Sequence, residues 1–185
     1  MDAPIDVTTI FLQTERLLLR PWREEDLADF YAYASVEGVG EMAGWPHHRS
    51  VEESRAILRS FMENREVLAI VLRESGKVIG SLGLHRSWAN DEAEYAQMKV
   101  KKIGYVLAKE YWGRGLMPEA VRAVIRYCFE ELGLDALTCE HFAFNAQSRR
   151  VIEKCGFVFV KEDLYEAKLL NKTYPEKAYI LLRAA

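Results

Sequence analysis

One segment of the 185-residue chain limits its fold more than any other. In IGYVLAKEYWGRGLMPEAV, an apolar run from Ile103 leads through Gly113-Arg114-Gly115 into a stretch with apolar residues at helical spacing. That spacing predicts a helix of about four turns, ending near Leu132-Gly133, before a second apolar run at 136–144 predicts another strand. Strands joined by such a helix are parallel and connected right-handedly. The sheet should therefore contain one parallel pair, with a glycine turn after its first strand.

The rest of the chain predicts antiparallel strands and further helices around this unit. Ser50 and Glu53 form a capping-box pattern at the start of one helix. The expected elements are a strand at 16–21, helices at 23–34, from 50 to about 64 and at 145–155, a β-hairpin of 67–73 and 78–85, and two closing strands. We therefore expect one α+β domain over residues 1–185 with a mostly antiparallel, mixed sheet. Residues 1–13 are expected to be a loosely ordered segment.

Charge and cysteine content narrow the class of protein. The chain has 25 basic and 28 acidic residues, a net charge of -3, so we expect neither nucleic acid nor a membrane as partner. Cys128, Cys139 and Cys155 are an odd number with no close pair, which favours reduced thiols over a disulfide framework. The first twenty residues show no signal-peptide pattern. A cytoplasmic protein is expected.

The glycine turn is suited to an anion. The first N–H groups of a helix lack helical partners, and the helix dipole adds partial positive charge there. A Walker loop would need lysine and a hydroxyl after Gly115, and neither follows. A dinucleotide fingerprint would need a small residue in place of Pro118, and its acid at the end of the next strand, whereas Asp135 lies at the start. Taken alone, a turn without a ligand explains the glycines about equally well.

A second segment, NAQSRRVIEKCGF at 145–157, makes a family resemblance specific. Together the two segments resemble the signatures of the GNAT acetyltransferase superfamily, a (Gln/Arg)-x-x-Gly-x-Gly/Ala turn and an Asn-x-x-Ser-x-x-apolar-x-Glu-Lys-x-Gly-Phe helix. The matching helix residues are Asn145, Ser148, Val151, Glu153, Lys154, Gly156 and Phe157. IGYVL and TERLLLRP resemble the branch that acetylates ribosomal-protein N-termini and its small-molecule relatives. The likeness extends from Thr14 to Arg183.

The resemblance implies an acetyl-CoA-dependent N-acetyltransferase of GNAT fold, with helices on both faces of the sheet and a splayed parallel strand pair. A primary amine would attack the thioester directly. The implied cofactor-binding residues are Tyr105, Val106 and Leu107 for pantetheine and Trp112, Gly113, Arg114, Gly115, Leu116 and Met117 for pyrophosphate. Asn145 would tie the second strand to the cofactor, and Ser148 would protonate the departing thiolate. Arg149 or Arg150 would reach the adenosine phosphate.

Two positions depart from the family pattern. Glu110 stands where the turn usually has Gln or Arg, and Lys102 stands where relatives often place an acid. The general base is therefore open. Glu140, on the strand that leads into Asn145, is our candidate, although an edge-exposed polar role explains it equally well.

The acceptor side is less marked. Candidates to face the acceptor are Trp45, His85, Trp88 and His141, with core packing as the alternative for the tryptophans. No metal is expected, because His47 and His48 lack an acid-rich partner at ligand spacing.

Two other functions stay open. A catalytically silent acyl-CoA-binding or sensing domain would fit Lys102, and a nucleotide-binding regulatory module could use the same turn. For an active enzyme the expected acceptor is a small-molecule amine or a protein N-terminus. The oligomeric state is also open, with a homodimer as one option.

Overall fold

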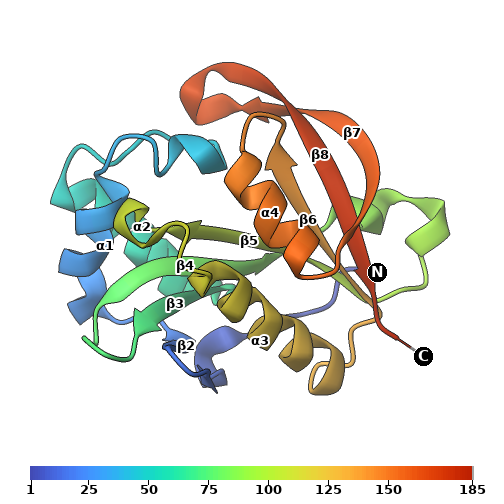
Figure 1. Cartoon of the computed structure of the whole chain (residues 1–185), viewed down its shortest axis with the longest axis horizontal. Helices are drawn as coiled ribbons and strands as arrows, with labels where there is room; N and C mark the ends of the chain where they lie inside the picture. Colours follow the sequence, from blue (N-terminus) through green and yellow to red (C-terminus); the bar gives the residue numbers. More distant parts are fainter. Residues whose placement is uncertain (185) are drawn as a thin grey trace.

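The computed structural model describes residues 1–184, which form an eight-stranded sheet flanked by helices (Figure 1). The strand order is β1-β2-β3-β4-β5-β6-β8-β7. The strands are β1 (Leu12–Gln13), β2 (Leu17–Pro21), β3 (Val67–Leu72), β4 (Val78–His85), β5 (Val100–Leu107), β6 (Ala136–Phe142), β7 (Val158–Ala167) and β8 (Lys172–Leu182). The helices are α1 (Leu27–Ala34), α2 (Val51–Asn64), α3 (Leu116–Glu130) and α4 (Ala146–Lys154).

The central pair, β5 and β6, is parallel, and all other pairs of named strands are antiparallel. β5 and β6 pair over three positions only, from Val100 opposite Ala136 to Lys102 opposite Thr138. Beyond that point β5 stays paired with β4, and β6 stays paired with β8. The two strands therefore separate toward their carboxyl ends. This confirms the α+β fold with a mostly antiparallel sheet and a splayed parallel pair.

Helices cover both faces of the sheet, as expected. α3 and α4 lie on one face, where Leu116, Val124 and Ile152 join the core that includes Leu19 and Leu137. On the other face α1 and α2 bring residues such as Phe30 and Leu58 onto β3 and β4. Apolar stripes at helical spacing produce this arrangement, since each helix can bury only one face.

Local signals placed most elements within a few residues of their observed bounds. Pro21 ends β2, and Gly156 ends α4 with a φ of 88°. The helix expected at 23–34 begins as a 3-10 turn, Glu24–Asp26, before α1. The Ser50 hydroxyl accepts from the Glu53 amide as predicted, but the Glu53 carboxylate accepts from the amide of Arg49.

The first thirteen residues, for which we expected loose order, pack against the sheet. Ala3, Val7 and Ile10 are buried in the same core as α3. Their apolar side chains would otherwise be exposed, which accounts for this docking. Among residues 1–184, no helix combines the length and apolar character needed to cross a bilayer.

A buried ion pair fixes the entry into α1. The Arg20 guanidinium donates two bonds of 2.8 Å to Asp26, and both side chains are under 10% exposed. Asp26→Asn should lower the free energy of unfolding by about 3–5 kcal/mol, because it leaves the Arg20 charge buried without a counter-charge. Urea denaturation measures the change.

The control is the equally bidentate but exposed pair Arg86–Asp91, with contacts of 2.7 and 2.6 Å. Asp91→Asn should leave the urea midpoint almost unchanged, since water screens exposed pairs. Equal losses in the two variants would contradict burial as the source of the effect.

Candidate active site

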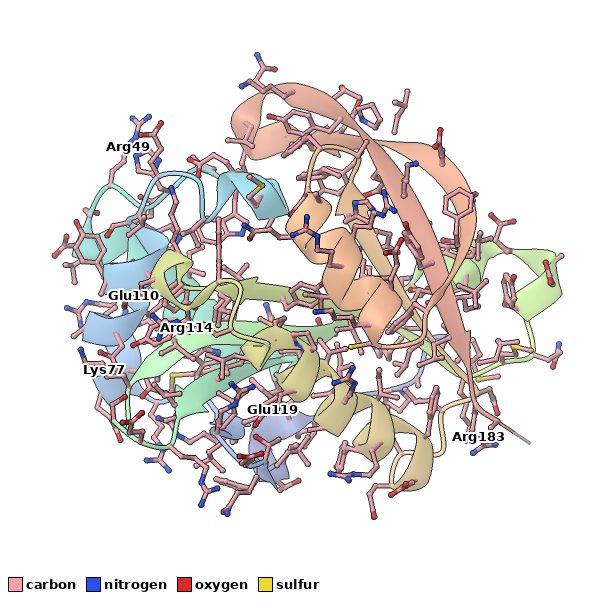
Figure 2. All side chains as sticks on the ribbon, viewed as in Figure 1. Arg49, Lys77, Glu110, Arg114, Glu119 and Arg183 are labelled. Carbon is pink, nitrogen blue, oxygen red and sulfur yellow. The ribbon has the colours of Figure 1, made fainter. Side chains whose placement is uncertain are left out.

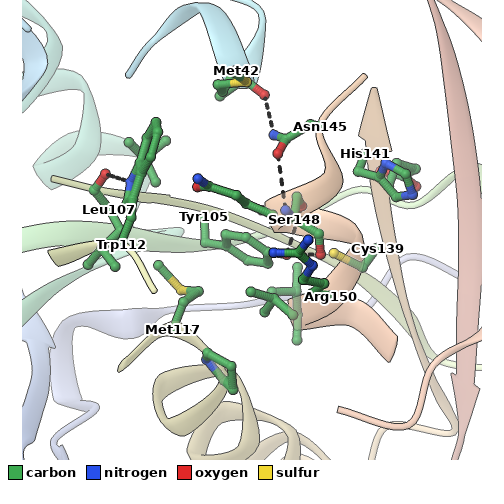
Figure 3. Close-up of a pocket in the computed structure, with 18 of the residues that line it drawn as sticks. Met42, Tyr105, Leu107, Trp112, Met117, Cys139, His141, Asn145, Ser148 and Arg150 are labelled. Atoms are coloured by element: carbon green, nitrogen blue, oxygen red, sulfur yellow. Dashed lines mark hydrogen bonds between the residues drawn. The ribbon is translucent and has the colours of Figure 1, made fainter. Parts of the chain in front are cut away.

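A cavity of about 420 Å³ lies where β5 and β6 separate (Figure 3). After Lys102 and Thr138 the two strands no longer pair, so their facing edges leave a gap. The lining residues come from β5, β6, the turn before α3, α4, the loop after α1 and the β7–β8 hairpin. This gap brings together segments that are far apart in the sequence.

The turn before α3 forms one wall of the cavity. Gly113 and Gly115 have φ angles of 75° and 74°, a region that favours glycine. A Cβ at Gly113 would meet no atom within 4 Å, so this stretch of backbone is open to a ligand. The Trp112 indole N–H donates to the carbonyl of Leu107 at 2.8 Å and holds the turn against the end of β5. The turn therefore presents the free amides at the start of α3 to the cavity.

The start of α3 is also held from the other side, through Glu119, which is labelled in Figure 2. Glu119 accepts from the Arg16 side chain at 2.7 Å and from the Thr14 hydroxyl at 2.6 Å. Arg16 in turn donates to the carbonyl of Arg114 at 3.0 Å. Arg16 therefore binds both the turn and the first helical turn, which fixes the direction in which the free amides point.

α4 forms the opposite wall. The Asn145 side chain accepts from the Ser148 amide at 3.0 Å and donates to the carbonyl of Met42 at 3.3 Å, so it joins α4 to the loop after α1. The hydroxyls of Ser148 and Tyr105 share a hydrogen bond of 2.8 Å. Burial raises the pKa of Tyr105 well above its usual value, so Tyr105 stays protonated and can donate. Ser148 is then free to turn its own proton toward the cavity.

The two faces of the sheet carry different groups to the gap. Alternation along the strands turns Tyr105 and Cys139 toward α3 and α4, whereas Lys102 and Glu140 turn toward the α1 face. On the α4 side the lining cations are Arg150 and Lys154. One cavity thus has a cationic end near α4 and a carboxylate-rich end on the other face.

We call the carboxylate-rich end the acceptor end, because Glu140, our candidate for the base, lies there. It is defined by Lys102, Glu140 and Glu176 with its walls. Lys102 lies 3.3 Å from Glu140, whose side chain is 10% exposed. Glu176, on β8, pairs opposite Phe142 and so shares a face with Glu140. Burial, and then the neighbouring Glu140, raise the pKa of Glu176 to about 7. Burial also raises the pKa of Glu140, whereas the Lys102 charge acts to lower it.

The walls of the acceptor end are apolar and aromatic. They are formed by Val39, Met42, Phe142 and Tyr165. Gly44, with a φ of 91°, lets the loop after α1 approach closely, since a Cβ there would lie 3.1 Å from the Tyr165 ring. This loop covers the acceptor end.

Most of the predicted site residues line the cavity. They are Tyr105, Val106, Leu107, Trp112, Gly113, Gly115, Leu116, Met117, Glu140, His141, Asn145, Ser148 and Arg150. Arg114 does not line it, and its guanidinium lies 5.2 Å from the Tyr111 ring centre. The His141 ring is held by the carbonyl of Phe142 and the Tyr179 hydroxyl.

Three of the four acceptor candidates lie outside the cavity lining. Trp45 packs on His48 with ring centres 5.2 Å apart, and Trp88 packs on Tyr95 at 5.8 Å. His85 is held near Glu66, 3.4 Å away. Aromatic packing accounts for the positions of the two tryptophans, and the contact with Glu66 accounts for that of His85.

The sequence reasoning missed Glu176 and all four wall residues of the acceptor end, which include Met42 and Tyr165. Glu176 and Tyr165 lie on the last two strands, where no motif marks them, and Met42 lies in a short 3-10 turn, Glu41–Ala43. Alternation along β8 could have suggested that Glu176 faces the same side as Ala178. The register that puts it beside Glu140 needs the folded sheet.

The family model for the acetyltransferase (GNAT) domain matches residues 16–158. The chain belongs to the GNAT acetyltransferase family. GNAT domains are acyltransferases, with acetyl-CoA as the typical donor. The predicted superfamily is thus confirmed, and the match spans both segments that carried the resemblance.

Similar proteins agree with this assignment. An uncharacterised N-acetyltransferase of Bacillus subtilis, YoaA, is 28% identical over 79% of this chain and 81% of its own. The crystal structure of a ribosomal-protein-S5-alanine acetyltransferase from Vibrio fischeri is 19% identical, with a TM-score of 0.72 over 94% of this chain and 96% of that chain. The microcin C7 self-immunity acetyltransferase MccE, solved with acetyl-CoA and AMP, has 18% identity and a TM-score of 0.73, covering 92% and 94%. These structures share the GNAT fold.

The raised pKa of Glu176 predicts a pH-dependent stability. Between its ordinary pKa of 4.5 and about 7, the folded state binds the Glu176 proton more tightly than the unfolded state. Glu176 therefore makes its full contribution to the free energy of unfolding at low pH, and this contribution is lost as pH rises through that window. Glutamine at position 176 does not titrate, so the Tm of Glu176→Gln relative to wild type should rise from pH 5 to pH 8.

Thermal unfolding at several pH values measures this difference. Glu166→Gln, an exposed position on β7, is the control and should track wild type. A Tm difference for Glu176→Gln that stays constant from pH 5 to pH 8 would contradict a buried, proton-binding carboxylate.

Proposed function

We propose that this GNAT domain, comprising residues 1–185, transfers the acetyl group of acetyl-CoA to a primary amine. The observation that carries the proposal is one continuous cavity between β5 and β6, with cations at one end and carboxylates at the other. A donor with phosphates and an acceptor with an amine have the matching charges. The gap between the strands is where the two would meet.

Three features support binding of the donor. The amides at the start of α3, with the open backbone at Gly113, suit the pyrophosphate, and Arg150 suits a further phosphate. Beyond Lys102, β5 is paired with β4 on one edge only, so backbone groups on its other edge face the gap. Pantetheine, which contains two amides, can pair with such an edge as an added strand does.

When bound, the donor supplies a thioester carbonyl as the electrophile. The amine nitrogen bonds to that carbon, the carbon–sulfur bond breaks, and sulfur leaves with the electron pair. In this proposal Glu176, beside Glu140, takes the proton that the amine loses, since a base works best with a pKa near the working pH. Ser148 gives its proton to the sulfur while the Tyr105 hydroxyl donates a hydrogen bond to Ser148. After the products leave, Ser148 regains a proton from solvent and Glu176 releases one to solvent. Glu140, the residue that the sequence suggested as the base, is paired with Lys102 and lies beside Glu176.

The glycine turn gives the first test of donor binding. Gly113→Ala should weaken acetyl-CoA binding about tenfold or more, because a residue with a side chain resists the positive φ and crowds the phosphate path. Isothermal titration calorimetry measures the dissociation constant.

Gly76→Ala is the matched control. Gly76 has a φ of 71° and, like Gly113, no atom within 4 Å of a built Cβ, but it lies in the β3–β4 turn. The Gly76→Ala variant should lose a similar amount of its free energy of unfolding and keep the wild-type affinity for acetyl-CoA. Equal affinities in Gly113→Ala and Gly76→Ala would remove the turn from the donor site.

Ser148 tests the chemical step. Ser148→Ala should lower kcat by about a hundredfold, with little change in the acetyl-CoA dissociation constant, because the lost proton transfer matters in the transition state. Stopped-flow release of free thiol under single-turnover conditions measures the step.

Ser75→Ala, in the β3–β4 turn, is the control and should keep full activity. A loss below about threefold in Ser148→Ala would reduce Ser148 to a residue that only supports the helix start. If wild type bound acetyl-CoA but acetylated no amine in a broad panel, the silent acyl-CoA-binding domain would be the better assignment.

A further inference from the structure

The acceptor end contains a buried acid that has no partner for one of its oxygens. Glu140 is nine-tenths buried, and its Oε2 lies 3.3 Å from the Lys102 ammonium. Its Oε1 is buried and has no hydrogen-bond partner in the described chain, although Glu140 lines the cavity. A buried, unpaired carboxylate oxygen is costly, so a donor is expected to occupy the space next to it. A ligand N–H group would satisfy it.

The charges at the acceptor end favour a cationic ligand. Two carboxylates, Glu140 and Glu176, face one ammonium, and Lys102 is already paired. The nearby lysines are also engaged, because Lys161 lies 2.7 Å from Glu92 and Lys177 lies 3.2 Å from Glu162. Of the described residues that line the cavity, the remaining cations, Arg150 and Lys154, belong to α4 at the opposite, cationic end, which we call the donor end.

The shape of the same end favours an apolar body on the ligand. Val39, Met42, Phe142 and Tyr165 surround the carboxylates, and the Phe142 and Tyr165 ring centres lie 5.4 Å apart. Burying an apolar part of the ligand against these walls is favourable, and the walls offer few hydrogen-bond partners to further polar groups of the ligand. The acceptor end thus combines two carboxylates with apolar walls around them.

We propose that the acceptor is a primary amine carried on an apolar or aromatic body, with no carboxylate next to the amine. This inference rests on the proposed function only in taking the acceptor end as the amine site. The ammonium donates to Glu140 Oε1 and faces Glu176. A carboxylate on the neighbouring carbon would enter the same anionic spot with no free cation to pair with it, and like charges held together at such a site oppose binding. Free α-amino acids are thereby disfavoured, whereas amides and simple amines fit.

Direct binding tests this without any need for turnover. Protein saturated with CoA is titrated at pH 7.5 with 2-phenylethylamine, phenylalaninamide and phenylalanine in a calorimeter. The first and third differ by a carboxylate, and the amide keeps the bulk of that carboxylate without its charge. We expect 2-phenylethylamine and phenylalaninamide to bind at least about tenfold more tightly than phenylalanine.

Two variants locate the effect. Glu176→Gln should reduce the difference in dissociation constant between phenylalaninamide and phenylalanine, because it removes one of the two carboxylates. Glu166→Gln, exposed on β7, should leave this difference unchanged. Equal narrowing in both variants would overturn the assignment to the acceptor end.

Phenylalanine binding within about twofold of phenylalaninamide would overturn the inference, as would a failure of all three compounds to bind. A parallel assay with acetyl-CoA reports separately on the proposed function. Selective binding without acetylation of any amine in the broad panel would support the inference and refute acetyl transfer. Acetylation of phenylalanine as efficient as that of its amide would refute the inference and support acetyl transfer.

Discussion

The site depends on the separation of β5 and β6 after three paired positions. A continuous sheet would pair both strands along their length and leave no path between its faces. Here each strand keeps one antiparallel neighbour, so the sheet stays intact while the free edges open a cavity. Backbone groups on these edges need partners, and a ligand with amides can supply them. The separated strands thereby leave unpaired main-chain edges along a cavity whose walls are held by side-chain contacts such as that of Trp112.

The separation also lets two faces of one sheet contribute to one cavity. Because side chains alternate along a strand, Tyr105 faces α4 while Lys102 faces away from it. Alternation along β6 and β8 puts Glu140 and Glu176 on the second face, with Lys102 of β5 beside Glu140. On the first face, α3 contributes the amides of its first turn, and α4 contributes Arg150 and Lys154.

Lys102 shows how one contact changes the interpretation of a sequence departure. At the position where relatives often have an acid, a lysine left the identity of the general base open. In the structure this lysine lies 3.3 Å from Glu140, and Glu176 stands on the same face. The carboxylates are therefore supplied by β6 and β8, and the lysine stabilises one of them.

The sequence by itself determined the local elements and much of the donor end. Periodicity, the glycines of the 113–115 turn and the Asn145–Ser148 spacing depend on neighbours within a turn or two of the chain, so they can be interpreted residue by residue. The parallel pair followed from the length of α3 between two strands. Thirteen of the predicted site residues line the cavity, and most of these positions came from the family resemblance that the two segments carry.

Only the tertiary structure decided the acceptor end. Glu176 lies beside Glu140 because of the register between β6 and β8, and Met42 reaches the cavity through the Asn145 contact. Trp45, His85 and Trp88 have polar or aromatic partners elsewhere, which their local sequence does not reveal. Strand register and long-range packing depend on the whole set of competing contacts, so no short segment encodes which distant side chains will meet.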